Sequence, residues 1–239
     1  MPTTQLDDAI SIVQKICTTC SLQFEMPTPF SRCWALCPVC SQKRREDHER
    51  ETLAEQKAAR KAEWREICPP DFLGTNPSAL PNQGAYNETM AWQYGRSGLL
   101  LIGPTGTGKS RSAWALAERE FKAAHSVLAL NALAGMDYAR RYSDSIYSAT
   151  EWVSRAVTTS LLILDDVFKV KLTDSFEAAL FAIISERTEN HRPCIVTSND
   201  TGESLLRRFS PDRGEPFVRR LREFCQTIVF ELAPANPAS

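Results

Sequence analysis

Short apolar runs alternate with longer amphipathic segments over the C-terminal two thirds of the chain. The runs are GLLLIG, SVLALNA, SLLILDD, PCIVTSN and QTIVFEL, which begin at residues 98, 126, 160, 193 and 226. Strands that are apolar at nearly every position are buried on both faces, as in a parallel sheet covered by helices. The pattern therefore predicts an α/β fold, with a parallel sheet flanked by helices.

The segments between the apolar runs have the pattern of helices, and one helix precedes the first run. The expected helices span residues 84–94, 109–124, 133–142, 148–157, 174–188, 202–209 and 215–224. Residues 43–67 contain no Gly or Pro and are dense in charge and in good helix formers, which predicts an exposed helical linker rather than a binding helix. Composition thus divides the chain into a cysteine-containing domain (1–42), a linker (43–67) and the α/β domain (68–239).

Composition and charge narrow the class of protein. The chain has 239 residues, 43% hydrophobic and 24% charged, which fits one medium and one small globular domain. A net charge of −1 argues against a protein that coats nucleic acid through bulk charge, so any such contact needs a local patch. The sequence has no apolar run long enough for a membrane span and an acidic start unlike a signal peptide, so we expect a cytoplasmic protein without membrane contact.

A phosphate-binding motif follows the first apolar run. GPTGTGKS, residues 103–110, fits G-x-x-x-x-G-K-[ST] between a predicted strand and a predicted helix, a context that disfavours a chance match. We expect Lys109 to reach the β- and γ-phosphates of ATP and Ser110 to bind Mg²⁺ through its hydroxyl. The residues expected to contact the nucleotide are Gly103, Pro104, Thr105, Gly106, Thr107, Gly108, Lys109, Ser110 and Arg111.

Polar residues end two later apolar runs. LLILDD places two carboxylates after a buried strand, where open α/β sheets bind ligands; the alternative is an ordinary strand-ending turn. We expect Asp165 to hold Mg²⁺, directly or through water, and Asp166 to orient or polarise the attacking water. Asn199 ends the run PCIVTSN and is expected to stand between the two motifs, within hydrogen-bond reach of that water or of the γ-phosphate.

Arginines are concentrated before the last apolar run, at positions 207, 208, 213, 219, 220 and 222. An arginine that reaches a neighbouring subunit's nucleotide site can accelerate hydrolysis by roughly 10³–10⁵. Arg219 and Arg220 point about 100° apart on a helix, so at most one of them can serve a given neighbour. Most of the six are expected to form a solvated basic face.

Five of the eight cysteines lie between residues 17 and 40. Cys17-x₂-Cys20 and Cys37-x₂-Cys40, separated by sixteen residues, have the spacing of a zinc ribbon. We expect these four thiolates to bind one structural Zn²⁺. Cys33 is an alternative to Cys37, His48 is a weaker substitute, and a redox-active or unligated cluster is the competing interpretation.

The motifs together resemble a known family. GLLLIGPTGTGKS, LLILDDVFKVKLTDSFEAALFAIISER, PCIVTSN and FVRRLRE, in this order, are similar to the DnaC/DnaI-type AAA+ ATPases, the replicative helicase loaders, a branch that includes the IstB-type transposition ATPases. The resemblance covers residues 66–231 and implies an AAA+ P-loop NTPase fold. It implies Lys109 and Ser110 as Walker A residues, Asp165 and Asp166 as Walker B, Asn199 as sensor 1 and Arg220 as the arginine finger. Loaders of this kind usually continue into a segment with a second nucleotide-sensing arginine, which this sequence lacks, so slow hydrolysis is expected.

The cysteine-containing domain favours the loader within this branch. DnaI-type loaders carry an N-terminal zinc domain that contacts the replicative helicase, whereas IstB-type proteins generally do not begin this way. The resemblance implies a hexameric replicative helicase as partner, assembly into a homo-oligomer with ATP bound or on the helicase, and a bacterial or phage-infected cytoplasm. Five apolar residues of this domain could contact the helicase or form the ribbon's own core: Leu22, Phe24, Met26, Phe30 and Trp34.

A mixed aromatic and basic segment is the candidate contact for single-stranded DNA. Residues 136–147 and the segment after the aspartates supply the candidates Tyr138, Arg140, Arg141, Tyr142, Tyr147, Lys169 and Lys171. Arginines can follow phosphates and tyrosines can stack on bases. The alternative is an amphipathic helix whose tyrosines belong to the core.

We therefore expect an ATPase that loads a hexameric helicase onto single-stranded DNA, using ATP, Mg²⁺ and Zn²⁺. The alternatives are a transposition ATPase that coats duplex DNA and an ATP-binding adaptor that inhibits a helicase with little turnover. A small-molecule kinase is disfavoured because no lid or acceptor-site motif is visible.

Overall fold

The computed structural model describes residues 11–27, 35–169, 172–200 and 202–232. The chain divides into two compact units, Met1–Ala62 and Glu63–Ser239, which are described separately below. Four residues considered above lie outside the described residues: Phe30, Cys33, Trp34 and Lys171.

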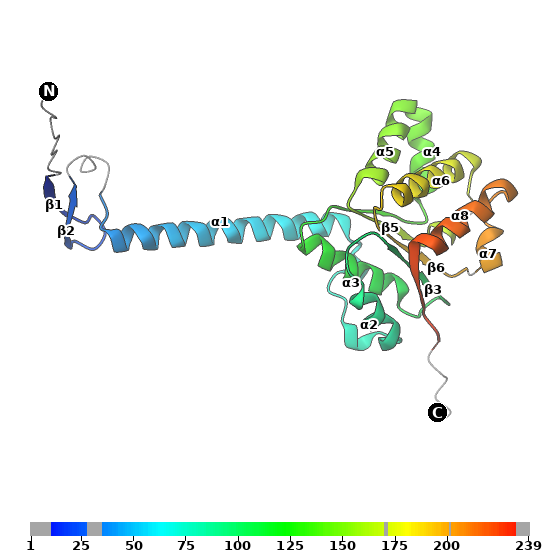
Figure 1. The fold of residues 1–239 in the computed structure, drawn as a ribbon, viewed down its shortest axis with the longest axis horizontal. Helices are drawn as coiled ribbons and strands as arrows, with labels where there is room; N and C mark the ends of the chain where they lie inside the picture. The colour runs from blue at the N-terminus through cyan, green and yellow to red at the C-terminus, as the bar shows by residue number, and fades with distance from the viewer. Residues whose placement is uncertain (1–10, 28–34, 170–171, 201, 233–239) are drawn as a thin grey trace, which may run out of the picture. The chain divides into compact units, whose positions relative to one another are not determined.

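The first unit contains a β-hairpin and most of a long helix (Figure 1). Strand β1 (Ile12–Ile16) pairs antiparallel with β2 (Gln23–Pro27). Helix α1 (Pro38–Ile67) begins five residues before the predicted linker helix. Proline suits a helix start, because the first turn has no use for its missing N–H. Cys40 therefore lies in the first turn of α1.

The second unit is built on a five-stranded sheet in which every described pairing is parallel, as predicted. The strands are β3 (Gly98–Ile102), β4 (Val127–Leu130), β5 (Leu161–Asp165), β6 (Cys194–Ser198) and β7 (Cys225–Val229). Their order is β4-β5-β6-β3-β7. Strand β6 therefore separates β3, which leads into the phosphate-binding motif, from β5, which ends in the aspartates.

Helices cover both faces of this sheet (Figure 1). They are α2 (Gln83–Ala91), α3 (Lys109–Lys122), α4 (Ala134–Asp144), α5 (Ile146–Thr158), α6 (Asp174–Glu189), α7 (Gly202–Leu206) and α8 (Pro211–Phe224). Strand residues alternate between the two cores: Leu99 and Leu101 pack with α2 and α3, while Leu100 packs with the core formed by α4 to α8. This alternation explains why the apolar runs are continuous.

Several element boundaries differ from the sequence prediction. Helix α7 ends at Leu206, three residues before the predicted end at 209. Helix α2 ends at Ala91, three residues before the predicted end. Helix α8 begins at Pro211, four residues before the predicted start at 215. Pro211 occupies the first turn, where its missing N–H costs no hydrogen bond.

Within the described residues, no helix combines the length and apolar character that crossing a bilayer requires.

The end of α1 belongs to the second unit and is buried there. Trp64, expected within an exposed linker, is 5% exposed. Its ring lies 6.0 Å from that of Trp114 and 5.2 Å from that of Phe121, both on α3. Burial of a large aromatic side chain stabilises this attachment. The prediction of a fully exposed segment is therefore wrong at its C-terminal end.

A buried arginine joins α5, α6 and the start of two strands. Arg187 is fully buried, and burial lowers the pKa of its guanidinium to about 10. Its terminal nitrogens donate to the carbonyls of Ala156, Val157, Thr159, Ser160 and Pro193. Four of these lie at or just after the C-terminus of α5, where a cation also complements the helix dipole. Arg187 therefore fixes the approach of the chain to β5.

Candidate functional site

The segment from Gly103 to Ser110 joins the end of β3 to the start of α3. Gly103 has φ +145°, and a Cβ there would collide with the backbone carbonyl of Phe230. Gly108 is the N-cap residue of α3 and has φ +98°, a left-handed conformation that favours glycine. The glycines of the motif thus allow a tight loop at the positive end of α3, where phosphate groups are favoured.

Lys109 lies under this loop and is 5% exposed. Its Nζ donates to the carbonyls of Gly103 and Pro104, each at 2.7 Å, and to Oδ1 of Asn199 at 2.9 Å. Burial lowers the pKa of Lys109, and the nearby carboxylates of Asp166 and Asp165 partly offset this effect. Asn199, which was expected to stand between the two motifs, therefore contacts the lysine of the phosphate-binding loop.

Ser110 and Asp165 form the predicted pair of oxygen ligands. The Ser110 hydroxyl donates to Oδ1 of Asp165 at 2.7 Å. Two cis ligands of an octahedral Mg²⁺ lie about 2.9 Å apart when each metal–oxygen bond is about 2.05 Å. A hydroxyl and a carboxylate at this separation fit Mg²⁺, and these two residues would hold it.

Two residues without a role in the sequence prediction fix the Asp165 carboxylate. Nε1 of Trp114 donates to Oδ2 at 3.2 Å, and the Thr197 hydroxyl donates to Oδ1 at 2.7 Å. Trp114 lies one helical turn after Ser110, so both side chains face the same strand end. The Thr197 hydroxyl also accepts the backbone N–H of Asp166 at 3.0 Å. Thr197 therefore links the two aspartates.

Asp166 occupies a left-handed backbone conformation, with φ +53°. Aspartate tolerates this region better than most residues. Burial raises the pKa of Asp166, and the neighbouring Asp165 raises it further, while Lys169 and Lys109 lower it. A carboxylate with a raised pKa beside the phosphate-binding loop suits a group that orients or polarises water.

These residues border a cavity of about 270 Å³ in the second unit. Six residues of the predicted nucleotide set line it: Thr105, Gly106, Gly108, Lys109, Ser110 and Arg111. Asp166 and Asn199 line it as well. Gly103 and Pro104 instead support Lys109 through their carbonyls, and Thr107 is 1% exposed, with its hydroxyl donating to Pro104 at 2.8 Å.

An apolar wall of this cavity was missed from the sequence. Phe72, Leu80 and Pro81 line it, and the last two lie beside Gly108 of the glycine loop. Phe72 stacks on Trp114 with ring centroids 5.9 Å apart. These residues come from short 3₁₀ turns, Pro70–Phe72 and Pro77–Ala79, and the loop that follows, where no periodicity signals a role. An aromatic ring and aliphatic side chains beside a phosphate-binding loop suit a nucleotide base.

Arg220 lies apart from this cavity. Its guanidinium carbon is 4.8 Å from the centroid of the Phe181 ring on α6, and one terminal nitrogen is buried without a hydrogen-bond partner in the described part of the chain. Arg219 is on the exposed side of α8 and lies 3.9 Å from Glu223. The structure thus brings together four of the five predicted catalytic residues: Lys109, Asp165, Asp166 and Asn199. The fifth, Arg220, does not line the nucleotide cavity of its own chain.

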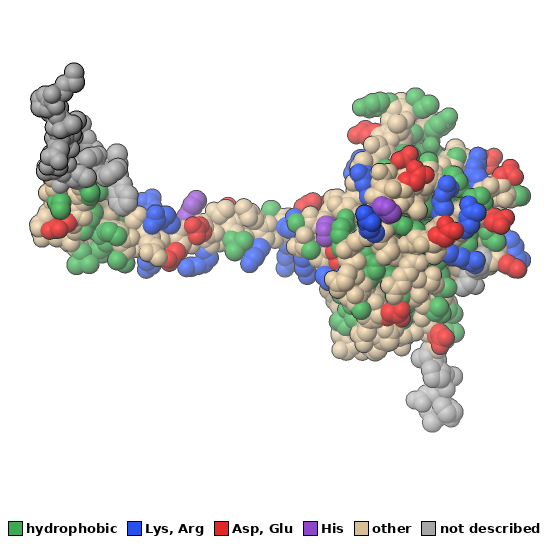
Figure 2. Space-filling view, viewed as in Figure 1, with side chains coloured by type: hydrophobic (Ala, Val, Ile, Leu, Met, Phe, Trp, Pro, Cys, Tyr) green, Lys and Arg blue, Asp and Glu red, His purple; other side chains and the backbone are tan. Residues whose placement is uncertain are grey.

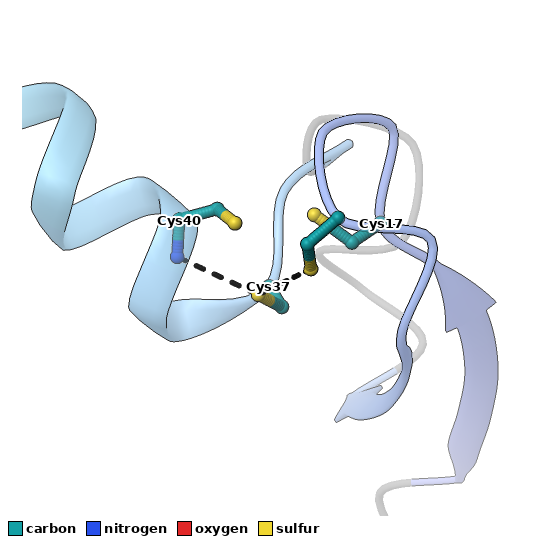
Figure 3. Close-up of side chains that lie close together, drawn as sticks. Cys17, Cys37 and Cys40 are labelled. Carbon is teal, nitrogen blue, oxygen red and sulfur yellow. Dashed lines mark hydrogen bonds between the residues drawn. The ribbon is translucent and has the colours of Figure 1, made fainter.

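The cysteines of the first unit converge as the spacing predicts. Figure 3 shows Cys17, Cys37 and Cys40 with their sulfur atoms turned toward one another. All four sulfurs, including that of Cys20, lie within 4.8 Å of one another, and those of Cys20 and Cys37 are 3.7 Å apart. Tetrahedral zinc with Zn–S bonds of about 2.3 Å places sulfurs about 3.8 Å apart, so the cluster fits Zn²⁺.

The backbone around the cluster favours the thiolate of Cys17. Ser21 has φ +58°, which closes the turn after Cys20, and the backbone N–H of Cys40 points at the Cys37 sulfur at 3.5 Å. Hydrogen bonding from the backbone of Cys37 lowers the pKa of Cys17 to about 6. The sulfurs of Cys20 and Cys37 raise the pKa of Cys40 to about 12, as expected when several thiols share one space. His48 is exposed and does not join the cluster.

The residues considered for DNA contact fall into two groups. Tyr138 is 8% exposed and packs on Trp152 and Phe176, so its expected role as a base-stacking residue is wrong. Tyr142 and Tyr147 are 52% and 76% exposed. Apolar side chains also gather over the α4–α5 pair in Figure 2. Tyr142 lies one helical turn after Tyr138 on the same face of α4, with ring centroids 6.2 Å apart, but it is beyond the core that encloses Tyr138.

The apolar residues of the cysteine unit differ in how exposed their side chains are. Met26 is 5% exposed and belongs to the small core of this unit, whereas Leu22 is 65% exposed. Phe24 is intermediate. Of the three described candidates, Leu22 is therefore the one that a partner can reach most directly.

The fold and the residues of the site define the class of protein. A glycine loop between β3 and α3, with paired aspartates after β5 and Asn199 after the intervening β6, is the arrangement of an AAA+ P-loop NTPase. The chain belongs to the family of IstB-like ATP binding proteins, whose sequence profile matches residues 28–212.

Solved structures share this fold. DnaI is 19% identical with a TM-score of 0.55, covering 70% of this chain and 95% of its own. The DnaC helicase loader is 19% identical with a TM-score of 0.52, covering 68% and 99%. AMPPCP-bound DnaA from Aquifex aeolicus is 17% identical with a TM-score of 0.51, covering 64% of this chain; the match spans only 46% of the DnaA chain. A search of curated proteins found no significant match.

Proposed function

We propose that this protein is an ATP-dependent loader of a hexameric replicative helicase onto single-stranded DNA. The cysteine unit holds the helicase, and the ATP-bound AAA+ units assemble side by side. Hydrolysis of ATP releases the loader. The observation that carries the proposal is the joining of two sites in one chain, a four-cysteine cluster and an assembled nucleotide site on a fold similar to DnaI and DnaC.

The nucleotide part of the proposal rests on the contacts around Ser110 and Asp165. Bound Mg²⁺ would neutralise charge on the phosphates and help to hold them against the glycine loop. Lys109 would exchange a carbonyl partner for phosphate oxygens, and Asn199 would remain beside them. Asp166 would orient or polarise the attacking water, since its raised pKa makes it a better base than an ordinary aspartate.

Assembly through Arg220 is supported by its position outside its own nucleotide cavity. The Arg220 guanidinium stacks on Phe181, and one of its nitrogens has no hydrogen-bond partner among the described residues, so it retains donors for an anion. In an assembly, the anion would be the terminal phosphate held by a neighbouring subunit. A second copy of the chain is therefore part of the proposed active state.

Single-stranded DNA would contact the exposed side of α4 and the start of α5. Arg140 is 73% exposed and can follow phosphates, although Asp137 lies 3.4 Å from it. Tyr142 and Tyr147 can stack on bases, and Lys169 is exposed after β5. Because this surface has few cationic side chains, we expect its affinity for single-stranded DNA to be modest and to fall steeply as the salt concentration rises.

The family match favours a second candidate, a transposition ATPase of the IstB type. That function requires ATP-driven polymers on duplex DNA and a transposase partner. The separate cysteine cluster argues for the loader, because a structural zinc site in its own unit supplies a rigid surface for a protein partner.

The experiment is size-exclusion chromatography with light scattering of the full chain mixed with a hexameric replicative helicase and AMPPCP. The wild type and Leu53→Asp should form a stable complex, whereas Leu22→Asp should not. Leu22 and Leu53 are both exposed, at 65% and 51%, in the first unit, so the pair separates docking from a general effect of an added charge. Polymers on duplex DNA with no helicase complex would instead support the transposition ATPase.

A further inference from the structure

A second, smaller hollow adjoins the nucleotide cavity and is lined by two cations, Lys169 and Arg208. Its volume is about 40 Å³, close to the space that one water molecule or one phosphate oxygen requires. Asp166 and Asn199 line both this hollow and the nucleotide cavity. Asp200, Arg208 and Lys169 also line the smaller hollow but not the nucleotide cavity. The part of the nucleotide cavity bordered by Asp166 and Asn199 is therefore continuous with the hollow that Arg208 lines. Arg208 comes from the turn after α7.

Arg208 is held in place through only one of its three nitrogens. Its Nε lies 2.8 Å from Oδ2 of Asp200, and the two side chains are 39% and 20% exposed. Asp200 is itself anchored, because Ser198 Oγ accepts its N–H and donates to its carbonyl, each at 3.0 Å. Among the described residues, the terminal nitrogens of Arg208 have no hydrogen-bond partner. The guanidinium is thus oriented while its two outer donor groups remain available.

We propose that Arg208 binds the terminal phosphate of a nucleotide held by the same chain, with Asp200 as its positioning residue. The inference rests on the nucleotide site proposed above. A guanidinium fork matches phosphate geometry, and a carboxylate on Nε leaves that fork free. Lys109 approaches the phosphates from the glycine loop, and Arg208 approaches from across Asp166 and Asn199.

This arrangement gives a single subunit a means to distinguish ATP from ADP. The Asp166 carboxylate lines this end of the site and repels a terminal phosphate, whereas the charge of Asp200 is paired with Arg208. Arg208 offsets that repulsion only when the terminal phosphate is present. The preference for ATP is then set within the chain, before any neighbour supplies Arg220.

The adjacent Arg207 provides a matched control. It is 77% exposed, lies 3.7 Å from Glu203 and is absent from the residues around the hollow. Arg207→Ala removes the same charge from the same segment without touching the proposed phosphate contact. It also reports any general effect of net charge on nucleotide affinity.

The test is calorimetric titration with Mg²⁺ and either AMPPCP or ADP, at a concentration where light scattering shows a monomer. Arg208→Ala and Arg208→Gln should lower AMPPCP affinity by about tenfold, the loss of a charge-assisted hydrogen bond, and leave ADP affinity unchanged. Asp200→Ala should give a smaller loss in the same direction, and Arg207→Ala should change neither. Retained ADP binding also demonstrates that each variant is folded.

Two different failures are distinguishable. If Arg208→Ala and Arg208→Gln change the two affinities equally, or change neither, while Lys109→Ala abolishes binding, then the role of Arg208 is wrong and the nucleotide site stands. If Lys109→Ala binds both nucleotides normally, the nucleotide site itself is wrong, and the inference about Arg208 fails with it.

Discussion

Nε1 of Trp114 donates a hydrogen bond of 3.2 Å to Oδ2 of Asp165, whose other carboxylate oxygen accepts the hydroxyls of Ser110 and Thr197. Trp114 is also 2% exposed and packs on Phe72 and Trp64. One side chain thus belongs to the core and orients the carboxylate that would hold Mg²⁺. Substitutions that keep its shape can separate these two roles.

Trp114→Phe should weaken binding of Mg²⁺–AMPPCP by about tenfold, because it removes a hydrogen bond to a charged group and keeps an aromatic ring in the core. Titration calorimetry with and without Mg²⁺ measures the effect, and metal-free binding should change little. Trp92→Phe is the control, since it removes a similar indole bond, to the carbonyl of Ser97 at 3.2 Å, away from the site. Equal losses in the two variants would contradict the role of Trp114.

Thr197→Val should slow ATP hydrolysis at least tenfold and destabilise the fold by about 1–3 kcal/mol, because the buried N–H of Asp166 loses its acceptor. Thr197→Ser keeps the hydroxyl and should retain most of the activity. Steady-state hydrolysis and thermal unfolding measure the two effects. Normal turnover by the valine variant would show that the link between the aspartates is not needed.

Asp166→Asn should abolish hydrolysis, retain AMPPCP binding and raise the unfolding temperature of the nucleotide-free protein at pH 7. The folded-state pKa of Asp166 is raised, so its ionised form opposes folding at any pH above that value. This cost disappears as pH falls through the raised pKa toward the unfolded value of about 3.8, so the advantage of the variant should shrink over that window. Asparagine tolerates the left-handed backbone, which isolates the effect of charge.

The outcome that contradicts this explanation is a variant that is less stable than the wild type at pH 7, or an advantage that grows as pH falls. Either result would mean that the ionised Asp166 is stabilised in the folded chain.

Cys37→Ser should reduce the zinc content from about one ion per chain to near zero, because the cluster loses one of its four thiolates. Elemental analysis of the purified protein measures this. Cys68→Ser is the control, since Cys68 is equally buried but lies in the second unit, outside the cluster. Affinity for AMPPCP should be unchanged in both variants. A wild-type protein that is folded and free of zinc would refute the zinc site.

Arg220→Ala should leave AMPPCP binding by the monomer unchanged and remove the hydrolysis stimulated by helicase and single-stranded DNA. Mixing it with Lys109→Ala should restore part of the rate, because the intact nucleotide site of one chain then meets Arg220 of the other. Arg219→Ala is the control on the exposed side of α8. If Arg219→Ala loses the stimulation and Arg220→Ala keeps it, Arg219 is the finger.

Sequence reasoning succeeded where topology alone brings residues together. Lys109, Asp165 and Asn199 end or follow parallel strands, and carboxyl ends of parallel strands meet at one edge whatever the intervening sequence. The cysteines were predictable for a similar reason, because two C-x₂-C turns specify their own geometry.

The remaining site residues carry no pattern of their own. Trp114 and Thr197 have the apolar spacing of a core helix and a core strand, and only the structure reveals their polar atoms at Asp165. Phe72 acts from a short 3₁₀ turn without periodicity. Arg208 is one of six nearby arginines, and its contact with Asp200 depends on how the turn after α7 folds back.

Loading of a hexameric helicase onto circular single-stranded DNA tests the central claim most directly, because a circle has no end that a closed ring can thread. The amount of helicase retained on the circle should rise only when the wild-type protein and ATP are both present. Lys109→Ala should leave it at the level of helicase alone. Equal retention with Lys109→Ala, or no increase with the wild type, would contradict an ATP-dependent loader.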